Sequence, residues 1–294
     1  AVDELSSSPS SAFPFVNEAD KAKPLGCEEI AEDDERRLQA AFQRAQPFVI
    51  RNASKALASW EDQWSRSSLL EIAGEEFVEV SFTTNAGELN SFEPLSAWQD
   101  FLDANRRYFE APAGVDKVLV RPVKKLLRMR QLLALLASGQ TEIAGVRGRP
   151  YLHQSELHMN LPALLPLVTE PPWIAATGWV GKETNVWLSS GDTYTSLHQD
   201  TTQNVMVQYT GTKEFLLFPP EQKELLYYEP VLELARDSRQ TGTIFVGRSG
   251  RGVSDNHGLV NARSPDLESH PEYSRARGRR CRIGRGDALF VPHA

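Results

Sequence analysis

The sequence predicts an α+β chain, with helices mainly in its first half and a small β barrel or sandwich in its second half. Apolar residues recur at helical spacing in three segments of the first half, 27–46, 94–109 and 123–138. After residue 140 the pattern changes to short apolar runs separated by Gly and Pro. This distribution of helices and strands is typical of an α+β domain.

The N-terminal part begins with a segment, 1–26, that is rich in Ser, Pro and Ala, and we expect it to be a disordered leader. The region 27–139 should then form helices and strands that pack on the barrel. Its first helix is indicated by Leu38, Ala41 and Phe42, which follow an acidic run and lie on one helical face.

Two strands are also expected in this region. Residues 48–50 form a short apolar run before a polar turn, and residues 77–82 alternate between apolar and polar and end at a turn over 85–87. Trp60 and Trp64 are four residues apart, which predicts one face of a helix.

The predicted helix 123–138 should end at Gly139, because glycine is favoured directly after a helix. The region 140–294 is expected to be the barrel core. Its strand signals are, in order, PYLHQ, NVWLSS, NVMVQYTG, KEFLLFPP and ALFVP. The Gly-rich residues 240–258 should form a long excursion between strands, and they lack the GK[ST] ending of a phosphate-binding loop.

Composition narrows the classes of function. The net charge is −7, which weighs against a nucleic-acid-binding surface, and we expect the basic run 275–285 to be a solvated loop. The longest apolar stretch is much shorter than a membrane span. Two cysteines, Cys27 and Cys281, are too few for a disulfide framework and lack zinc-binding spacing, so an intracellular reducing compartment, cytoplasmic or nuclear, is the simpler expectation.

The residues that carry chemistry lie in SSGDTYTSLHQDTTQNVMVQYTGTKEFLLFPP. His198 and Asp200 are separated by one residue, so on an extended chain both side chains lie on the same face. An imidazole and a carboxylate placed in this way can form two corners of a 2-His-1-carboxylate iron site. Thr195, Asn204 and Lys213 are polar neighbours, and a hydroxyl and an ammonium could hold the far carboxylate of a dicarboxylate.

The segment TSLHQDTTQNVMVQYTGTKEFLLFPP resembles the metal-binding strand pair of the JmjC protein hydroxylases, a family with lysyl and asparaginyl hydroxylases among its members. The likeness runs from about residue 46 to the end, and the order of motifs matches throughout. The other similar segments are QPFVIRNASKALASW, PYLHQSELHMNLPALLPLV, SPDLESHPEYSRA and GRGDALFVPHA. The resemblance implies a double-stranded β-helix, the jelly-roll of the cupins, with the N-terminal helices packed outside it.

The resemblance also implies the cofactors, Fe(II) and 2-oxoglutarate. Residues His198 and Asp200 match the first two iron ligands, and Thr195 and Lys213 match the residues that bind the far carboxylate of 2-oxoglutarate. Asn204 matches a second polar contact to the co-substrate. Tyr151 matches a tyrosine that reaches the co-substrate pocket. Its position is explained equally well if it is an aromatic residue of the barrel wall.

The second histidine ligand of this family follows the last strand signal, beyond Ala294, and His293 is not at the matching position. We therefore expect the chain to be a fragment that lacks its natural C-terminus and holds iron weakly, through two protein ligands. The remaining histidines are expected to be structural or to lie at the surface: His153, His158, His257 and His270. Of these, His153 could line the substrate side of the pocket.

The activity that the resemblance implies is hydroxylation of a protein side chain, lysyl in one interpretation, with O₂ consumed and succinate and CO₂ as co-products. Three alternatives stay open: a methyl-lysine demethylase, a tRNA-modifying oxygenase, and a cupin-like binding protein without catalysis. The expected partner is a protein or peptide, not a membrane or nucleic acid. The resemblance leaves open a homodimer of the full-length protein, built by helices that follow the barrel.

Overall fold

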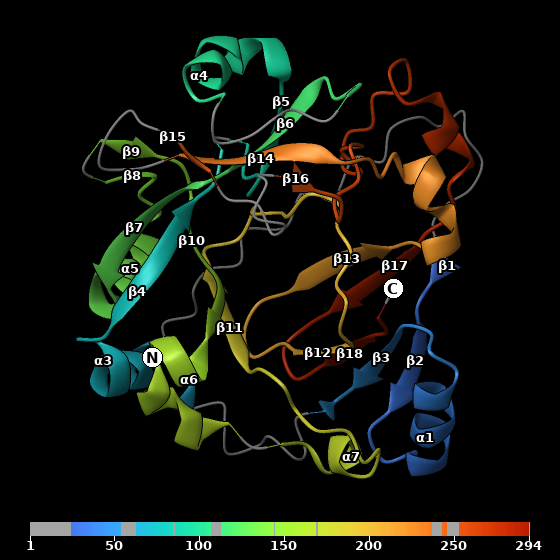
Figure 1. The fold of residues 1–294 in the computed structure, drawn as a ribbon. Helices are drawn as coiled ribbons and strands as arrows, with labels where there is room; N and C mark the ends of the chain where they lie inside the picture. The colour runs from blue at the N-terminus through green and yellow to red at the C-terminus, as the bar shows by residue number, and fades with distance from the viewer. Residues whose placement is uncertain are drawn as a thin grey trace.

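The fold is described by a computed structural model for most of the chain. The described residues are 25–53, 63–84, 86–106, 113–143, 145–168, 170–236, 243–245 and 253–293. Strands far apart in sequence pair with one another and so join the two halves of the chain. In Figure 1 the strands occupy the middle of the molecule and most helices lie at its edges.

Two sheets form the centre. One has four strands, in the order β12 (Asn204–Val207), β18 (Ala288–Val291), β3 (Phe48–Arg51) and β2 (Glu28–Ala31). The other has three strands, in the order β1 (Leu25–Gly26), β17 (Arg279–Ile283) and β13 (Lys213–Leu217). The expected strand at 48–50 is confirmed as β3, and it pairs antiparallel with β18, so the N-terminal region completes a sheet of the C-terminal region.

Two further sheets flank this centre. The first is β11 (Asn185–Ser189), β10 (Pro150–Glu156), β4 (Phe77–Phe82) and β7 (Val123–Arg128). The second is β15 (Thr243–Phe245), β14 (Val231–Arg236), β6 (Lys117–Arg121) and β5 (Ser91–Pro94), with β16 (Val253–Ser254) beside β14. A small hairpin is formed by β8 (Glu142–Ile143) and β9 (Val146–Arg147).

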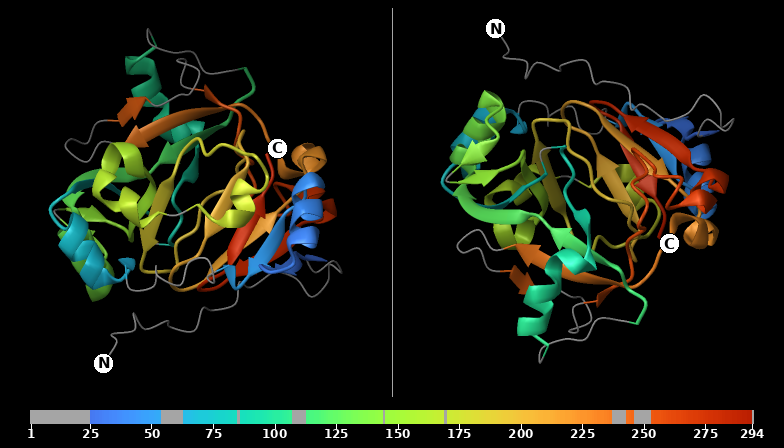
Figure 2. Two further views of the ribbon diagram at one scale, coloured as in Figure 1. Left: turned by 90° about the horizontal axis from the view of Figure 1, so that it is seen from below. Right: turned by 90° about the horizontal axis from the view of Figure 1, so that it is seen from above.

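The helices cover the outer faces of the sheets, as Figures 1 and 2 show. Among the described residues, the α-helices are α1 (Glu35–Gln43), α3 (Arg66–Ala73), α4 (Gln99–Ala104), α5 (Met129–Ser138), α6 (Leu157–Asn160) and α7 (Pro172–Ala175). The same part of the chain contains the 3₁₀ helices η2 (Leu95–Trp98), η3 (Pro162–Leu167), η4 (Pro220–Leu226) and η5 (Pro271–Arg275). The predicted class, mainly β with helices packed outside, is confirmed.

Helix α1 shows why its residues fold in this way. The Asp34 side chain accepts a hydrogen bond from the backbone N–H of Arg37 at 3.1 Å and caps the helix start. Leu38, Ala41 and Phe42 are buried as the spacing predicts, and the Phe42 ring lies 5.1 Å from that of Phe290 in β18. The helix therefore seals one side of the central four-stranded sheet.

On the other side of the molecule, α5 packs against β4 and β10. Leu132 and Leu133 of the helix share a buried cluster with Val78, Val80 and Leu152 of the two strands. The helix ends at Gly139, whose φ of 65° is the left-handed conformation that glycine adopts most readily, and the predicted helix end is confirmed.

The predicted helix 123–138 is wrong in its first part. Residues Val123–Arg128 form β7, which pairs with β4 along its whole length, and the helix starts only at Met129. The periodicity of this apolar and basic stretch fits either conformation, and the neighbouring strand decides. The helix-prone segment 27–46 likewise contains a strand, β2, before α1, because residues 28–31 pair in parallel with β3.

Of the other predicted helices, turns and strands, some are confirmed, some are shorter than predicted, and some lie outside the described residues. The segment 94–109 is helical only as η2 and α4, since β5 extends to Pro94, and residues 107–112 lie outside the described part. The turn position Asn85 and the helix position Trp60 also lie outside it, as do most of the glycines in 240–258. The strand signals from PYLHQ to ALFVP are confirmed as β10, β11, β12, β13 and β18.

The two cysteines, too few for a disulfide framework and expected in a reducing compartment, are joined to each other. Cys27 and Cys281 form a disulfide with a Cα–Cα distance of 5.1 Å, which lies in the ordinary range. The bond links the segment between β1 and β2 to the middle of β17. Leu25 and Gly26, which the sequence analysis placed in a disordered leader, form β1 against β17, while residues 1–24 lie outside the described part. The division of the chain at residues 27 and 140 stays a prediction.

Candidate metal and co-substrate site

The segment that carries His198 and Asp200 is extended and runs between β11 and β12. His198 Nδ1 lies 2.8 Å from the carbonyl oxygen of Ser196, so this nitrogen is placed to donate its proton to that oxygen. The other ring nitrogen, Nε2, is then the one with a free lone pair. A histidine ring that a backbone carbonyl fixes in this way is typical of metal-ligating imidazoles.

Asp200 is exposed and has two polar neighbours. Asn204, at the start of β12, donates its Nδ2–H to Asp200 Oδ2 at 3.2 Å. Burial raises the pKa of Tyr228, and the negative charge of Asp200 raises it further, which indicates that the two side chains are close. The hydrogen bond from Asn204 holds one carboxylate oxygen in place, and it is the kind of contact that orients a metal ligand.

Lys213 is the first residue of β13 and is partly buried. Its ammonium lies 5.4 Å from the centroids of the Trp187 and Phe215 rings. Burial lowers the pKa of Lys213 to about 8, so the group is mostly charged at neutral pH but poorly hydrated. A cation in this state gains strongly from an anionic partner.

Tyr151 and His153 lie two residues apart on β10, with ring centroids 5.4 Å apart. The pKa of His153 is lowered to about 3, chiefly by burial and in addition by the charges of His198 and Lys213. Because such charges act at short range, His153 lies in the neighbourhood of both predicted site residues. The imidazole is therefore neutral at physiological pH.

The backbone explains how His153 is presented. The pairing of β10 with β11 shifts register between Leu152 and Ser155, and Gln154 has a φ of 48°. A bulge of this kind turns neighbouring side chains away from the direction that regular alternation would give. Burial alone raises the pKa of the adjacent Tyr151, so this phenol stays protonated.

The structure brings most of the predicted site residues together. His198, Asp200 and Asn204 are joined within one segment, and the charge of Lys213 reaches His153 as that of His198 does. Thr195 is partly buried in the same segment, directly before the buried Ser196. The roles of these residues and of Tyr151 stay predictions.

The donor set fits iron(II) with two ligands from this part of the chain, the imidazole of His198 and the carboxylate of Asp200. Within the described residues no group of three His, Cys, Asp or Glu side chains is arranged to hold a metal ion. His293 is exposed beyond the end of β18.

One residue beside the predicted ligand has no functional role in the sequence-based prediction. His257 was expected to be structural or to lie at the surface; it is buried, and its ring lies 5.8 Å from that of His198 in a stacked orientation. Residues 197–199 and 256–258 pair there as an isolated antiparallel bridge. The available signal was a run of hydrogen-bonding side chains, Ser254, Asn256 and His257, next to Gly258.

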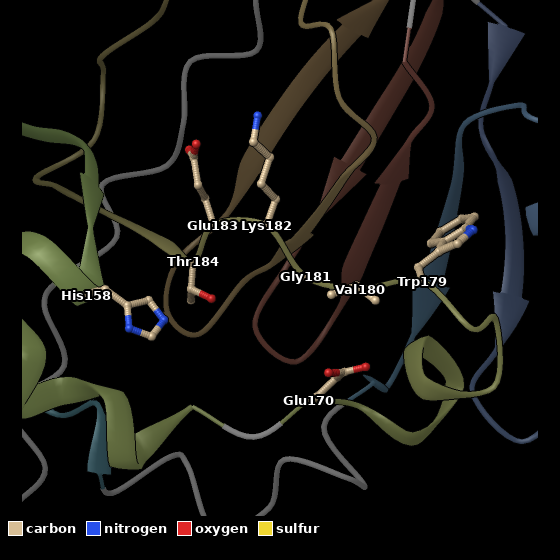
Figure 3. A pocket seen from close by; sticks show the side chains of 8 residues that line it. All are labelled: His158, Glu170, Trp179, Val180, Gly181, Lys182, Glu183 and Thr184. Carbon is tan, nitrogen blue, oxygen red and sulfur yellow. The ribbon is translucent and has the colours of Figure 1, made fainter.

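A surface hollow of about 420 Å³ lies elsewhere, between α6, α7 and the segment before β11 (Figure 3). Its lining residues are His158, Glu170, Trp179, Val180, Gly181, Lys182, Glu183 and Thr184. It contains none of the predicted iron or co-substrate residues.

Comparison with known proteins defines the class. The family model for the cupin-like domain matches residues 35–294, so the chain belongs to this family. It is 27% identical over 253 residues to the human bifunctional peptidase and (3S)-lysyl hydroxylase JMJD7, covering 84% of this chain and 70% of that protein.

Two further relatives carry JmjC-type names. The chain is 28% identical to the JmjC domain-containing protein F of Dictyostelium discoideum, over 48% of this chain and 31% of that protein. It is 29% identical to the lysine-specific demethylase 8 of Danio rerio, over 58% of this chain and 36% of that protein, so it spans about a third of the length of these two relatives. The predicted family, a JmjC-type cupin-like protein related to a lysyl hydroxylase and to demethylases, is confirmed.

In the part of the chain that the structure describes, no helix is both long enough and apolar enough to cross a membrane.

Proposed function

We propose that this chain forms the catalytic domain of an Fe(II)- and 2-oxoglutarate-dependent oxygenase that hydroxylates a protein side chain. One observation carries the proposal. The imidazole of His198 is fixed with its Nε2 available, two residues from a carboxylate, in the neighbourhood of a buried lysine. His198 and Asp200 could thus bind a metal ion, and Lys213 could bind an anion.

His198 and Asp200 would hold the iron. The Ser196 carbonyl keeps the imidazole proton on Nδ1, and Asn204 orients the carboxylate, so both ligands are arranged before the metal binds. Iron bound together with 2-oxoglutarate and O₂ supplies the oxidative decarboxylation that yields succinate and CO₂ and the oxidation of a substrate C–H bond.

Lys213 would bind the far carboxylate of 2-oxoglutarate, because a poorly hydrated ammonium pairs strongly with an anion. Thr195, Asn204 and Tyr151 are proposed as further hydrogen-bonding contacts. His153 adds a neutral imidazole that does not compete for the carboxylate as a second cation.

A lysyl side chain is the substrate that we favour, because the relative covered over most of its length is named a lysyl hydroxylase. The second candidate is removal of a methyl group from lysine, which is favoured by the relatives named lysine-specific demethylases. The net charge of −7 weighs against an RNA substrate. A cytoplasmic or nuclear location stays a prediction.

The test measures succinate released from 2-oxoglutarate with Fe(II) and ascorbate, using the full-length protein. Asp200→Ala should abolish release, and Asp192→Ala, an exposed aspartate of the preceding loop, should not. Equal rates for wild type and Asp200→Ala would show that the ligand assignment is wrong. Mass shifts of +16 or −14 in a lysyl or methyl-lysyl peptide separate hydroxylation from demethylation.

A non-catalytic binding protein is the remaining alternative. It predicts that 2-oxoglutarate or a metal binds without turnover, and it would replace the oxygenase proposal if the full-length protein binds Fe(II) and 2-oxoglutarate but releases no succinate.

A further inference from the structure

The iron-binding segment is held by a second segment of the chain, and we propose that Asn256 is the positioning residue of this contact. It would set the relative orientation of His198 and Asp200 through the backbone of Gln199, the residue between them. The inference rests on the proposed function and adds to it a residue outside the predicted ligand and co-substrate set.

Asn256 binds both polar groups of the Gln199 backbone. The N–H of Gln199 donates to the carbonyl oxygen of Asn256 at 3.0 Å, and the Asn256 Nδ2–H donates to the carbonyl oxygen of Gln199 at 3.3 Å. These two groups belong to the peptide units that lead to His198 on one side and to Asp200 on the other. Fixing both units fixes the angle between the two ligand side chains.

The amide of Asn256 is itself oriented. Its Oδ1 accepts a hydrogen bond from the Ser254 hydroxyl at 2.8 Å and lies 2.9 Å from His257 Nδ1. Two donors at Oδ1 leave the NH₂ group to face the Gln199 carbonyl. The three side chains are almost fully buried, with 3%, 8% and 3% exposure for Ser254, Asn256 and His257, so water competes little with these bonds.

The segment around Asn256 is anchored at both ends. Before it, β16 pairs with β14, with Ser254 opposite Val231. After it, the N–H of Gly258 donates to the carbonyl oxygen of Leu197 at 2.9 Å. Among the described residues, this short bridge is the backbone pairing of the His198 segment on that side, and the segment is not part of a regular strand. The anchored segment therefore supplies the rigidity that the hydrogen bonds of a regular strand pair would otherwise give.

The experiment titrates the full-length protein with Co(II), a spectroscopic substitute for Fe(II), and records the visible absorption bands. Four proteins are compared: wild type, Asn256→Ala, His198→Ala and Asn105→Ala. Asn105 is a matched control, because its side chain also donates to a backbone carbonyl, that of Phe101 at 2.8 Å, but in α4 and its C-terminal turn. Thermal unfolding of each variant establishes the folded fraction to which the affinity refers.

We expect wild type and Asn105→Ala to bind Co(II) equally, His198→Ala to lose binding, and Asn256→Ala to bind about tenfold more weakly with altered band intensities at saturation. A role limited to stability would lower the unfolding temperature but leave the affinity and the spectrum of the folded protein unchanged. Equal affinity and equal spectra for wild type and Asn256→Ala would overturn the inference and leave the proposed function intact.

If Asn256→Ala does not fold, Ser254→Ala takes its place, because it removes the hydroxyl that orients the amide and leaves Asn256 itself present. It should weaken Co(II) binding by about threefold, and an unchanged affinity counts against the inference. Absence of Co(II) binding by the wild type would overturn the metal site of the proposed function, and this inference with it.

Discussion

The ammonium of Lys213 lies 5.4 Å from the centroid of the Trp187 ring, across two strands that are not paired with each other. The ring offers a weak attraction to the cation but no anion, so the charge is poorly compensated. Burial accordingly lowers the pKa of Lys213 to about 8. A bound carboxylate would reverse this effect by favouring the charged form.

Binding of 2-oxoglutarate should therefore weaken as the pH rises. Because the ammonium is charged below its pKa of about 8 and neutral above it, affinity should fall about tenfold between pH 7 and 9. Calorimetric titration of the Co(II)-loaded protein with 2-oxoglutarate measures this affinity at each pH. Above pH 8, binding of 2-oxoglutarate should be accompanied by uptake of a proton from the buffer. A dissociation constant that does not change over this range would remove Lys213 as the anion anchor.

Replacement of Lys213 by an apolar residue should stabilise the fold and remove binding of 2-oxoglutarate. Its folded pKa lies below the ordinary value of 10.5, so the unfolded state binds more protons between about pH 8 and 10.5, and the lysine destabilises the fold below that window. Lys213→Met should raise the free energy of unfolding at pH 7 by on the order of 1 kcal/mol and abolish 2-oxoglutarate binding. Lys124→Met, at an exposed position of β7, is the control. Loss of stability in Lys213→Met would contradict the account.

The strands that begin at Asn204 and Lys213 were predictable from local patterns, and β12 and β13 confirm them. The pairing of His198 with Asp200 was predicted from an extended chain, whereas His198 lies in an isolated bridge outside the named strands, so their role as two iron ligands stays a prediction. Residues 123–128 were not predictable, because the alternating pattern that makes them a strand is as weak as the helical one and the partner strand β4 settles the choice.

Contacts between segments that are far apart in the chain could not be predicted from the sequence either. The bridge between His198 and His257 depends on how a Gly-rich excursion returns to the site. The pairing of Cys27 with Cys281 crosses 254 residues and follows from β1 lying beside β17. Only the assembled sheets bring such residues together, so neither contact has a local signal.

The Cys27–Cys281 bond should stabilise the protein by restricting the unfolded chain. A disulfide that closes a long loop contributes typically about 2–4 kcal/mol. Cys27→Ser should therefore lower the unfolding temperature under oxidising conditions to that of the reduced wild type. Thermal unfolding with and without reductant measures the effect. An identical unfolding temperature for oxidised and reduced wild type would show that the bond adds no stability, and mass spectrometry of the non-reduced protein shows whether it forms.

Gly258 should be intolerant of any side chain, because Leu197, in the segment that carries His198, lies directly against it. A Cβ at this position would lie 2.8 Å from both Leu197 Cδ2 and the carbonyl oxygen of Leu226. The Leu226 contact is backbone and cannot yield easily, so Gly258→Ala should cost about 1–3 kcal/mol of stability. Since the N–H of Gly258 also bonds to Leu197, the shift should reach His198 and weaken Co(II) binding. Gly181→Ala is the control, as a Cβ there has nothing within 4 Å. Wild-type stability and metal affinity in Gly258→Ala would show that the two segments are not tightly packed.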